Sequence, residues 1–121
     1  MRLFAAIDLP DSVIETLAAL VERLRPAAKL AWSPPSNFHI TTKFFGHWPD
    51  ERLGELEAVL RGLPSRPAFP VSVRELGFYP SVRSPRVFWA GISAPEDLQR
   101  IARETDEAAS RLGFERETRK Y

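Results

Sequence analysis

One short stretch of the sequence carries three side chains that together could bind a phosphate and move a proton. His39, Thr41 and Lys43 stand at alternate positions in a run rich in aromatic and β-branched residues, which is typical of a β-strand. They would share one face of that strand, about 7 Å apart from one to the next. Histidine titrates near neutral pH and acts as a general acid or base, while threonine and lysine donate hydrogen bonds. A half-solvated strand without any function would show the same pattern, so this stretch alone leaves both interpretations open.

The rest of the sequence offers few other chemistries. The two histidines, His39 and His47, have no carboxylate cluster around them, which does not fit a metal site. The sequence has no glycine-rich phosphate loop and no Gly-x-Ser-x-Gly motif. It also lacks cysteine, which excludes disulfides and thiolate metal sites and agrees with a reducing cytoplasm. We therefore expect a cytoplasmic protein that holds no metal or cofactor.

The elements around this stretch are expected to alternate between strands and amphipathic helices. A Ser12-x-x-Glu15 capping box predicts the start of the first helix, and Asp50 is a candidate N-cap of the second. His47 and Tyr79 are expected in loops. The hydrophobic periodicity predicts strands over 2–8, 29–32, 36–46, 69–76, 86–92 and 115–121, and helices over 12–25, 53–63 and 95–112.

A weak internal repeat links the two halves of the chain. The runs 2–7 and 86–92 are similar, and each is followed by a proline, an acidic residue and an amphipathic helix. The first half then continues to the His39 strand, whereas the second half reaches Tyr121. Two similar strand–helix–strand units predict a pseudo-symmetric fold, although any two strand–helix pairs look somewhat alike.

Composition predicts one small globular domain. The chain has 121 residues, of which 44% are hydrophobic, including 8 Phe and 3 Trp. Its 17 basic and 16 acidic residues give a net charge of +1, which argues against a protein that coats nucleic acid but allows a partner with one or two phosphates. We expect neither a signal peptide nor a membrane span.

Three blocks of sequence stand in an order that resembles a known family. They are MRLFAAIDLP at 1–10, WSPPSNFHITTKFFG at 32–46 and SPRVFWAG at 84–91. Together they resemble the two-histidine (2H) phosphoesterases, in particular the RNA 2′,3′-cyclic phosphodiesterases, also called 2′–5′ RNA ligases. Residues 117–121 are similar to the residues that directly precede the second His-x-Thr motif in that family.

The resemblance implies an α+β fold and a metal-independent reaction. It implies two pseudo-symmetric lobes of antiparallel sheet, with helices packed outside and the sheets lining a central cleft. One His-x-Thr from each lobe would face the phosphate; one histidine would activate water and the other would protonate the leaving ribose oxygen. His39 and Thr41 match the first motif as catalytic residues, whereas His47 has no threonine two positions later and does not match the second.

The second His-x-Thr is not in the sequence. We therefore expect residues 1–121 to form one 2H phosphoesterase-like domain whose second lobe is incomplete at the C-terminus. A chain ending at Tyr121 would lack one proton-transfer group, so its hydrolysis should be slower by about 10²–10⁴. The complete protein is expected to be a monomer, whereas the open edge of the shortened sheet would favour association with another chain.

Further residues are candidates for binding the substrate. Lys43 would attract a phosphate from the cleft face, Arg83 and Arg86 flank a loop where an RNA end could lie, and Tyr79 could stack on a base. Each has an ordinary alternative as a surface side chain. The other aromatic side chains, Phe44, Phe45 and Trp89, are expected mainly in the core.

Two other functions stay open at this point. One is a non-catalytic module that binds RNA ends or nucleotides on the same scaffold, and the other is a small α+β interaction domain in which His39 is structural. Replacement of His39 by Ala in the complete gene product separates these, because only the enzyme has hydrolysis to lose.

Overall fold

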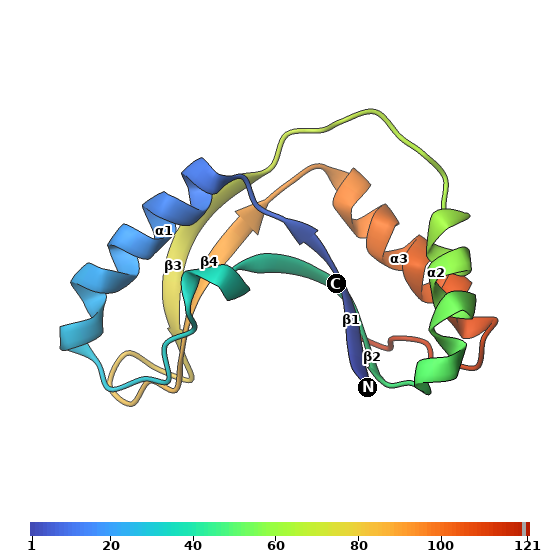
Figure 1. Cartoon of the computed structure of the whole chain (residues 1–121). Helices are drawn as coiled ribbons and strands as arrows, with labels where there is room; N and C mark the ends of the chain where they lie inside the picture. The colour runs from blue at the N-terminus through green and yellow to red at the C-terminus, as the bar shows by residue number, and fades with distance from the viewer. Residues whose placement is uncertain (120) are drawn as a thin grey trace. The chain divides into compact units, whose positions relative to one another are not determined.

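The chain combines strands and helices, as the sequence predicts, and forms an α+β protein in which the last two strands follow each other without a helix between them (Figure 1). The computed structural model describes residues 1–119 and 121. The elements are β1 (Arg2–Asp8), α1 (Asp11–Leu24), β2 (His39–His47), α2 (Leu53–Arg61), β3 (Ser72–Tyr79), β4 (Val87–Ser93) and α3 (Glu96–Ser110), with short 3₁₀ turns at Arg25–Ala27, Pro35–Asn37 and Asp50–Arg52.

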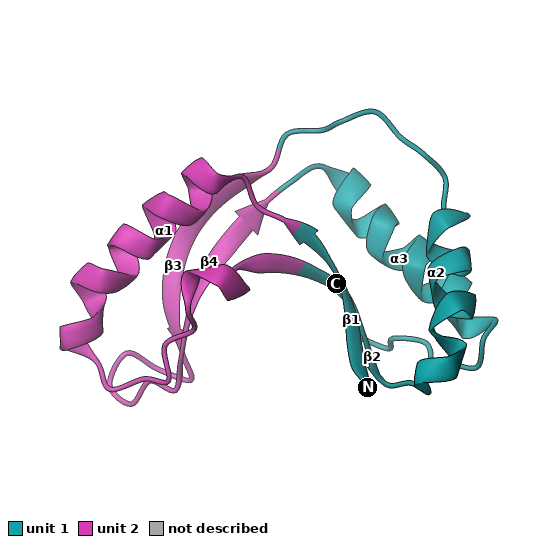
Figure 2. Ribbon diagram, in the orientation of Figure 1, with its two compact units in different colours: residues 1–7, 41–70, 94–121 teal, residues 8–40, 71–93 magenta. Residues whose placement is uncertain are grey.

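The chain forms two compact units, and each draws on separate parts of the sequence (Figure 2). Unit 1 comprises residues 1–7, 41–70 and 94–121, and therefore holds α2, α3 and most of β1 and β2. Unit 2 comprises residues 8–40 and 71–93, and holds α1 and the β3–β4 hairpin.

In unit 1, β1 and β2 form a two-stranded antiparallel sheet. The Met1 amino group donates to the carbonyl oxygen of Trp48 at 3.0 Å, and the Trp48 amide donates back to Met1 at 2.8 Å. Further along, the Thr42 hydroxyl donates to the carbonyl oxygen of Ala5 at 3.2 Å. The bonded positions rise along the first strand, from Met1 to Ala5, while they fall along the second, from Trp48 to Thr42. The two strands are therefore antiparallel.

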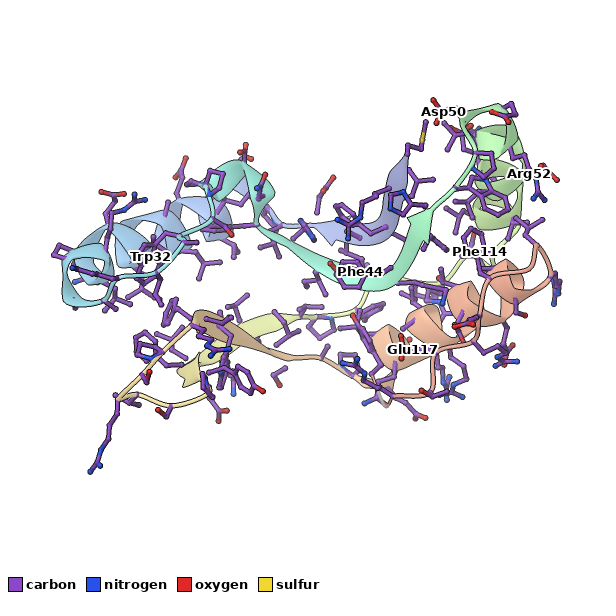
Figure 3. All side chains as sticks on the ribbon, turned by 90° about the horizontal axis from the view of Figure 1, so that it is seen from below. Trp32, Phe44, Asp50, Arg52, Phe114 and Glu117 are labelled. Carbon is purple, nitrogen blue, oxygen red and sulfur yellow. The ribbon has the colours of Figure 1, made fainter. Side chains whose placement is uncertain are left out.

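The core of unit 1 lies between this sheet and the two helices α2 and α3. Phe114 lies between the helices (Figure 3), with its ring centroid 5.1 Å from Phe45 and 4.4 Å from Trp48. Odd-numbered positions of both strands face this core, because side chains alternate along a strand. The core consists of Phe45, Leu56 and Ala109, surrounded by Leu3, Ala5, Leu60, Leu112 and Phe114.

In unit 2, β3 and β4 form an antiparallel hairpin with one irregularity. Glu75 has φ of +61°, and the pairing shifts between Arg74 and Leu76, which is a β-bulge. Gly77 pairs with Trp89, and a Cβ at Gly77 would lie 2.2 Å from the indole ring. Only glycine leaves room for this ring across the hairpin.

The sequence-based predictions of the main elements are confirmed, and so is the internal repeat of strand, proline and helix. Both β1–α1 and β4–α3 place a proline in extended conformation at the N-cap, Pro10 in the first and Pro95 in the second. The capping box is wrong: α1 begins at Asp11, because the carbonyl of Pro10 already accepts from the amides of Val13 and Ile14. Ser12 therefore lies inside the helix.

Two predicted strands are absent from the described residues. Residues 29–32 form no strand, and the indole of Trp32 donates locally to the carbonyl oxygen of Ala28 at 3.3 Å. Residues 115–119 and 121 also form no strand; the side chains of Lys43 and Asp106, rather than a neighbouring strand, bind the backbone groups of Glu115 and Glu117. Residue 120 lies outside the described part of the chain. His47 and Tyr79, expected in loops, are instead the last residues of β2 and β3.

The candidate N-cap at Asp50 is also wrong. Pro49 precedes the 3₁₀ turn Asp50–Arg52, and no side chain caps it or α2. The carboxylate of Asp50 instead accepts from the amino group of Met1 at 3.2 Å. Among the residues described, no helix has the length and apolar character needed to cross a membrane.

Candidate functional site

The predicted catalytic residues lie at the start of β2. A 3₁₀ turn precedes the strand, in which the amide of Phe38 donates to the carbonyl of Pro35 at 3.1 Å. His39 is the first residue of the strand and Thr41 is the third, and both are partly exposed. Because side chains alternate along a strand, the imidazole and the hydroxyl project from the same side of β2. A proton-transfer group and a hydrogen-bond donor therefore stand two positions apart on one strand.

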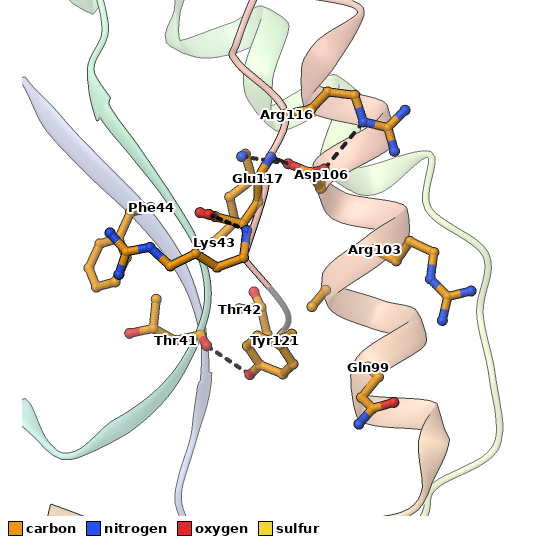
Figure 4. A pocket seen from close by; sticks show the side chains of 12 residues that line it. Thr41, Thr42, Lys43, Phe44, Gln99, Arg103, Asp106, Arg116, Glu117 and Tyr121 are labelled. Atoms are coloured by element: carbon orange, nitrogen blue, oxygen red, sulfur yellow. Dashed lines mark hydrogen bonds and ion pairs between the residues drawn. The ribbon is translucent and has the colours of Figure 1, made fainter.

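Lys43 lies two positions further along β2, and its role in attracting a phosphate stays a prediction. Its residue exposure is 8%, and its ammonium group lies 2.7 Å from Oδ1 of Asp106 on α3. The ammonium also donates to the carbonyl oxygen of Glu115 at 3.2 Å. Lys43 thus has two acceptors within unit 1, the carboxylate of Asp106 on α3 (Figure 4) and the backbone carbonyl that follows this helix at Glu115.

Asp106 is the centre of this polar cluster. Its Oδ1 also accepts the backbone amide of Glu117 at 2.9 Å, and its Oδ2 lies 3.4 Å from Nε of Arg116. Burial alone would raise the pKa of Asp106, but the hydrogen bonds from Lys43 and Glu117 and the nearby positive charges outweigh that effect. The pKa of Asp106 is therefore lowered, and the carboxylate stays ionised near neutral pH.

A cavity of about 610 Å³ lies beside this cluster within unit 1 (Figure 4). The hydroxyl of Tyr121 donates to the carbonyl oxygen of Thr41 at 2.8 Å, and burial raises the pKa of this phenol. The tyrosine thus binds the edge of β2 at the predicted catalytic threonine. The cavity is lined by Thr41, Thr42, Lys43, Phe44, Gln99, Ala102, Arg103, Asp106, Arg116, Glu117, Arg119 and Tyr121.

The other predicted substrate-binding residues belong to the β3–β4 hairpin of unit 2. Tyr79, at the end of β3, is 65% exposed, and the amide of Arg86 donates to its carbonyl oxygen at 2.7 Å. Arg83 lies in the loop closed by this bond, and both arginines are exposed. The hairpin therefore brings one aromatic ring and two guanidinium groups to a single loop.

Two neighbouring phenylalanines on β2 differ completely in burial. Phe45 is in the core, as expected, whereas Phe44 is 74% exposed and lies on the outer face of the sheet, where its ring centroid is 6.2 Å from Phe4. The prediction of a core position is therefore wrong for Phe44, because even positions of β2 face away from α2 and α3. Trp89, at 43% exposure, lies across Gly77 rather than in a core.

Sequence reasoning missed Asp106 and its ion pair with Lys43. One pattern could have revealed it: Asp106 stands four residues after Ala102 and three before Ala109, within the apolar side of α3. A carboxylate at such a position requires a buried partner of opposite charge. Within residues 1–119 and 121, no group of three or more His, Asp or Glu side chains could hold a metal ion.

A comparison with models of protein families identifies the family of this chain. The model of the family described as LigT-like phosphoesterase matches residues 7–89, which include all of β2. The chain belongs to the LigT-like phosphoesterase family. This membership confirms the sequence-based prediction of a 2H phosphoesterase.

Individual relatives of this LigT-like chain carry the same functional name. RNA 2′,3′-cyclic phosphodiesterases of Archaeoglobus fulgidus and Methanocaldococcus jannaschii are 34% and 35% identical to it, each over 97% of the chain and over 66% and 65% of their own lengths. The chain thus spans slightly less than two thirds of the length of these relatives.

Solved structures confirm the α+β fold of the LigT-like chain. A crystal structure of a Thermus thermophilus protein has a TM-score of 0.81 and 31% identity, over 93% of this chain and 62% of that one. Escherichia coli LigT in complex with 3′-AMP has a TM-score of 0.80 and 26% identity, over 99% of this chain and 67% of that one.

Proposed function

We propose that the protein is an RNA 2′,3′-cyclic phosphodiesterase that opens a terminal cyclic phosphate to a 2′-phosphate. The observation that carries this proposal is the pair His39 and Thr41 on one strand of a chain in the LigT-like phosphoesterase family. Support comes from the relatives named RNA 2′,3′-cyclic phosphodiesterase and from the LigT structure with 3′-AMP.

The chemistry follows from the two side chains. Water attacks the phosphorus atom and gives a proton to a general base, while the bond from phosphorus to the ribose O3′ breaks and O3′ takes a proton from a general acid. His39 serves one of these two proton transfers, each typically contributing about 10²–10⁴ in rate. The Thr41 hydroxyl donates a hydrogen bond to a phosphoryl oxygen, on which negative charge increases as water attacks.

Ligation needs only a change of nucleophile. A ribose 5′-hydroxyl in place of water would form a 2′–5′ linkage by the same displacement of O3′. We infer that the same two residues would serve this reaction, because the proton transfers are identical.

The RNA beyond the cyclic phosphate is proposed to contact the β3–β4 hairpin. Tyr79 offers an exposed ring for stacking, and Arg83 and Arg86 offer positive charge to flanking phosphates. We also propose that the complete protein is a single-domain monomer located in the cytoplasm. The absence of cysteine supports this location.

The identity of the product tests the proposal. The gene product, expressed from its own reading frame, is incubated with a 2′,3′-cyclic nucleotide, and the phosphorus NMR spectrum is followed. We expect the cyclic resonance to be replaced by that of the 2′-phosphate alone. A 3′-phosphate product, or a cyclic phosphate that persists as long as without protein, would contradict the proposal.

A further inference from the structure

The ion pair between Lys43 and Asp106 is unusual because both charges are buried. Each residue is only 8% exposed, and the two are 63 positions apart in the sequence. Removing two charges from water costs more than their mutual attraction returns unless further hydrogen bonds satisfy them. The partners that supply those further bonds therefore indicate what the pair holds in place.

Those bonds go to the backbone that follows α3. Lys43 donates to the carbonyl oxygen of Glu115 at 3.2 Å, and the amide of Glu117 donates to Asp106 at 2.9 Å. The pair thus binds one carbonyl and one amide, two residues apart, in a segment that forms no ladder with β2 over its described residues. The ion pair therefore supplies these two backbone groups with the hydrogen-bond partners that a neighbouring strand would otherwise supply.

The same segment reaches the predicted catalytic threonine. At its end, the hydroxyl of Tyr121 donates to the carbonyl oxygen of Thr41 at 2.8 Å. The segment therefore contacts β2 twice, at Lys43 and at Thr41. On the opposite edge of β2, the bond from Thr42 to Ala5 fixes the strand to β1.

We propose that Lys43 and Asp106 are positioning residues, which hold the backbone of residues 115–117 beside β2 and thereby support the bond from Tyr121 that fixes the backbone of Thr41. This inference rests on the proposed function, in which Thr41 binds the phosphoryl oxygen. It also gives Lys43 a different role from direct phosphate binding. Two of its three N–H donors are occupied, and its side chain is shielded from solvent.

The test compares single variants, a double variant and a control in the gene product. Lys43→Met and Asp106→Leu each remove one charge and leave the other buried, and they can reduce folding as well as activity. The double variant Lys43→Met/Asp106→Leu removes both charges and keeps an apolar contact of similar size, so it should fold stably. Arg116→Met is the control, because Arg116 contacts Asp106 from an exposed position.

Two measurements are made on each protein, one with substrate and one without. For the double variant we expect kcat for 2′,3′-cyclic nucleotide hydrolysis to fall by about 10- to 100-fold, with KM within about twofold of the wild type, because misplacement of a catalytic group acts on the transition state. Hydrogen exchange at the amides of Glu117 and Thr41 should become at least about tenfold faster. The Arg116→Met protein should match the wild type in its hydrolysis kinetics and in its amide exchange.

Two results would overturn the inference. A folded double variant with unchanged kcat and unchanged amide exchange would show that the ion pair only stabilises the fold and does not position Thr41. A rise in KM for Lys43→Met but not for Asp106→Leu would instead make Lys43 a phosphate-binding residue. If the wild type hydrolyses no cyclic phosphate, the proposed function fails, while faster exchange at both amides in the double variant would still support the positioning of β2.

Discussion

Individual residues illustrate how far side-chain type and spacing can be interpreted. The sequence correctly placed His39, Thr41 and Lys43 at alternate positions of one strand. It could not predict the environment of Lys43, because Asp106 comes from a helix 63 positions later in the sequence. Periodicity predicts which side of an element a residue occupies, whereas its charge partners depend on tertiary packing.

Asp106 gives a prediction about the pH dependence of stability. Its pKa is lower in the folded protein than in the unfolded chain, where an aspartate titrates near about 3.9. Between these two values the unfolded state binds more protons, so the stabilisation is complete above the unfolded pKa and is lost as the pH falls through the folded one. The free energy of unfolding of the wild type should therefore decrease below about pH 4.

The comparison that checks this prediction is urea unfolding at several pH values for the wild type and Asp106→Asn. The variant should be less stable near neutral pH, and its stability should depend less on pH in the acidic range. Parallel stability curves for the two proteins would show that Asp106 does not contribute in this way.

At the scale of elements, the sequence predicted those with a strong local pattern. The helices and the four strands of the described residues follow hydrophobic periodicity, and Pro10 and Pro95 mark two helix starts. Residues 29–32, 115–119 and 121 show that a strand-like composition is insufficient, because a strand also needs a neighbour with free backbone groups. That neighbour is a property of the tertiary fold.

The alternation along β2 leads to a stability prediction from two adjacent residues. Phe45→Ala empties a core position between the sheet and α2 and α3, which should cost about 3–5 kcal/mol. Phe44→Ala is the matched control; this ring is 74% exposed and contacts Phe4, so its loss should cost about 1 kcal/mol or less. Denaturant unfolding of both variants measures the difference, and equal losses would contradict the assigned faces of β2.

At the scale of the whole molecule, the sequence predicted the fold class and the family. The α+β fold, the strand–proline–helix repeat and the resemblance to 2H phosphoesterases are all confirmed. The expectation of two lobes came from the family resemblance, but which segments make up each of the two compact units was beyond sequence reasoning, because each unit combines segments from distant parts of the chain. Contacts of this kind follow from packing and leave little trace in local patterns.

In the proposed function, His39 transfers a proton while a cyclic phosphate opens. The most direct test measures kcat on a 2′,3′-cyclic nucleotide and the Kd of the nucleotide product for the wild type and His39→Ala, both as complete gene products. We expect a kcat lower by about 10²–10⁴ in the variant, with Kd changed less than about threefold. A variant that hydrolyses the cyclic nucleotide as fast as the wild type would contradict it.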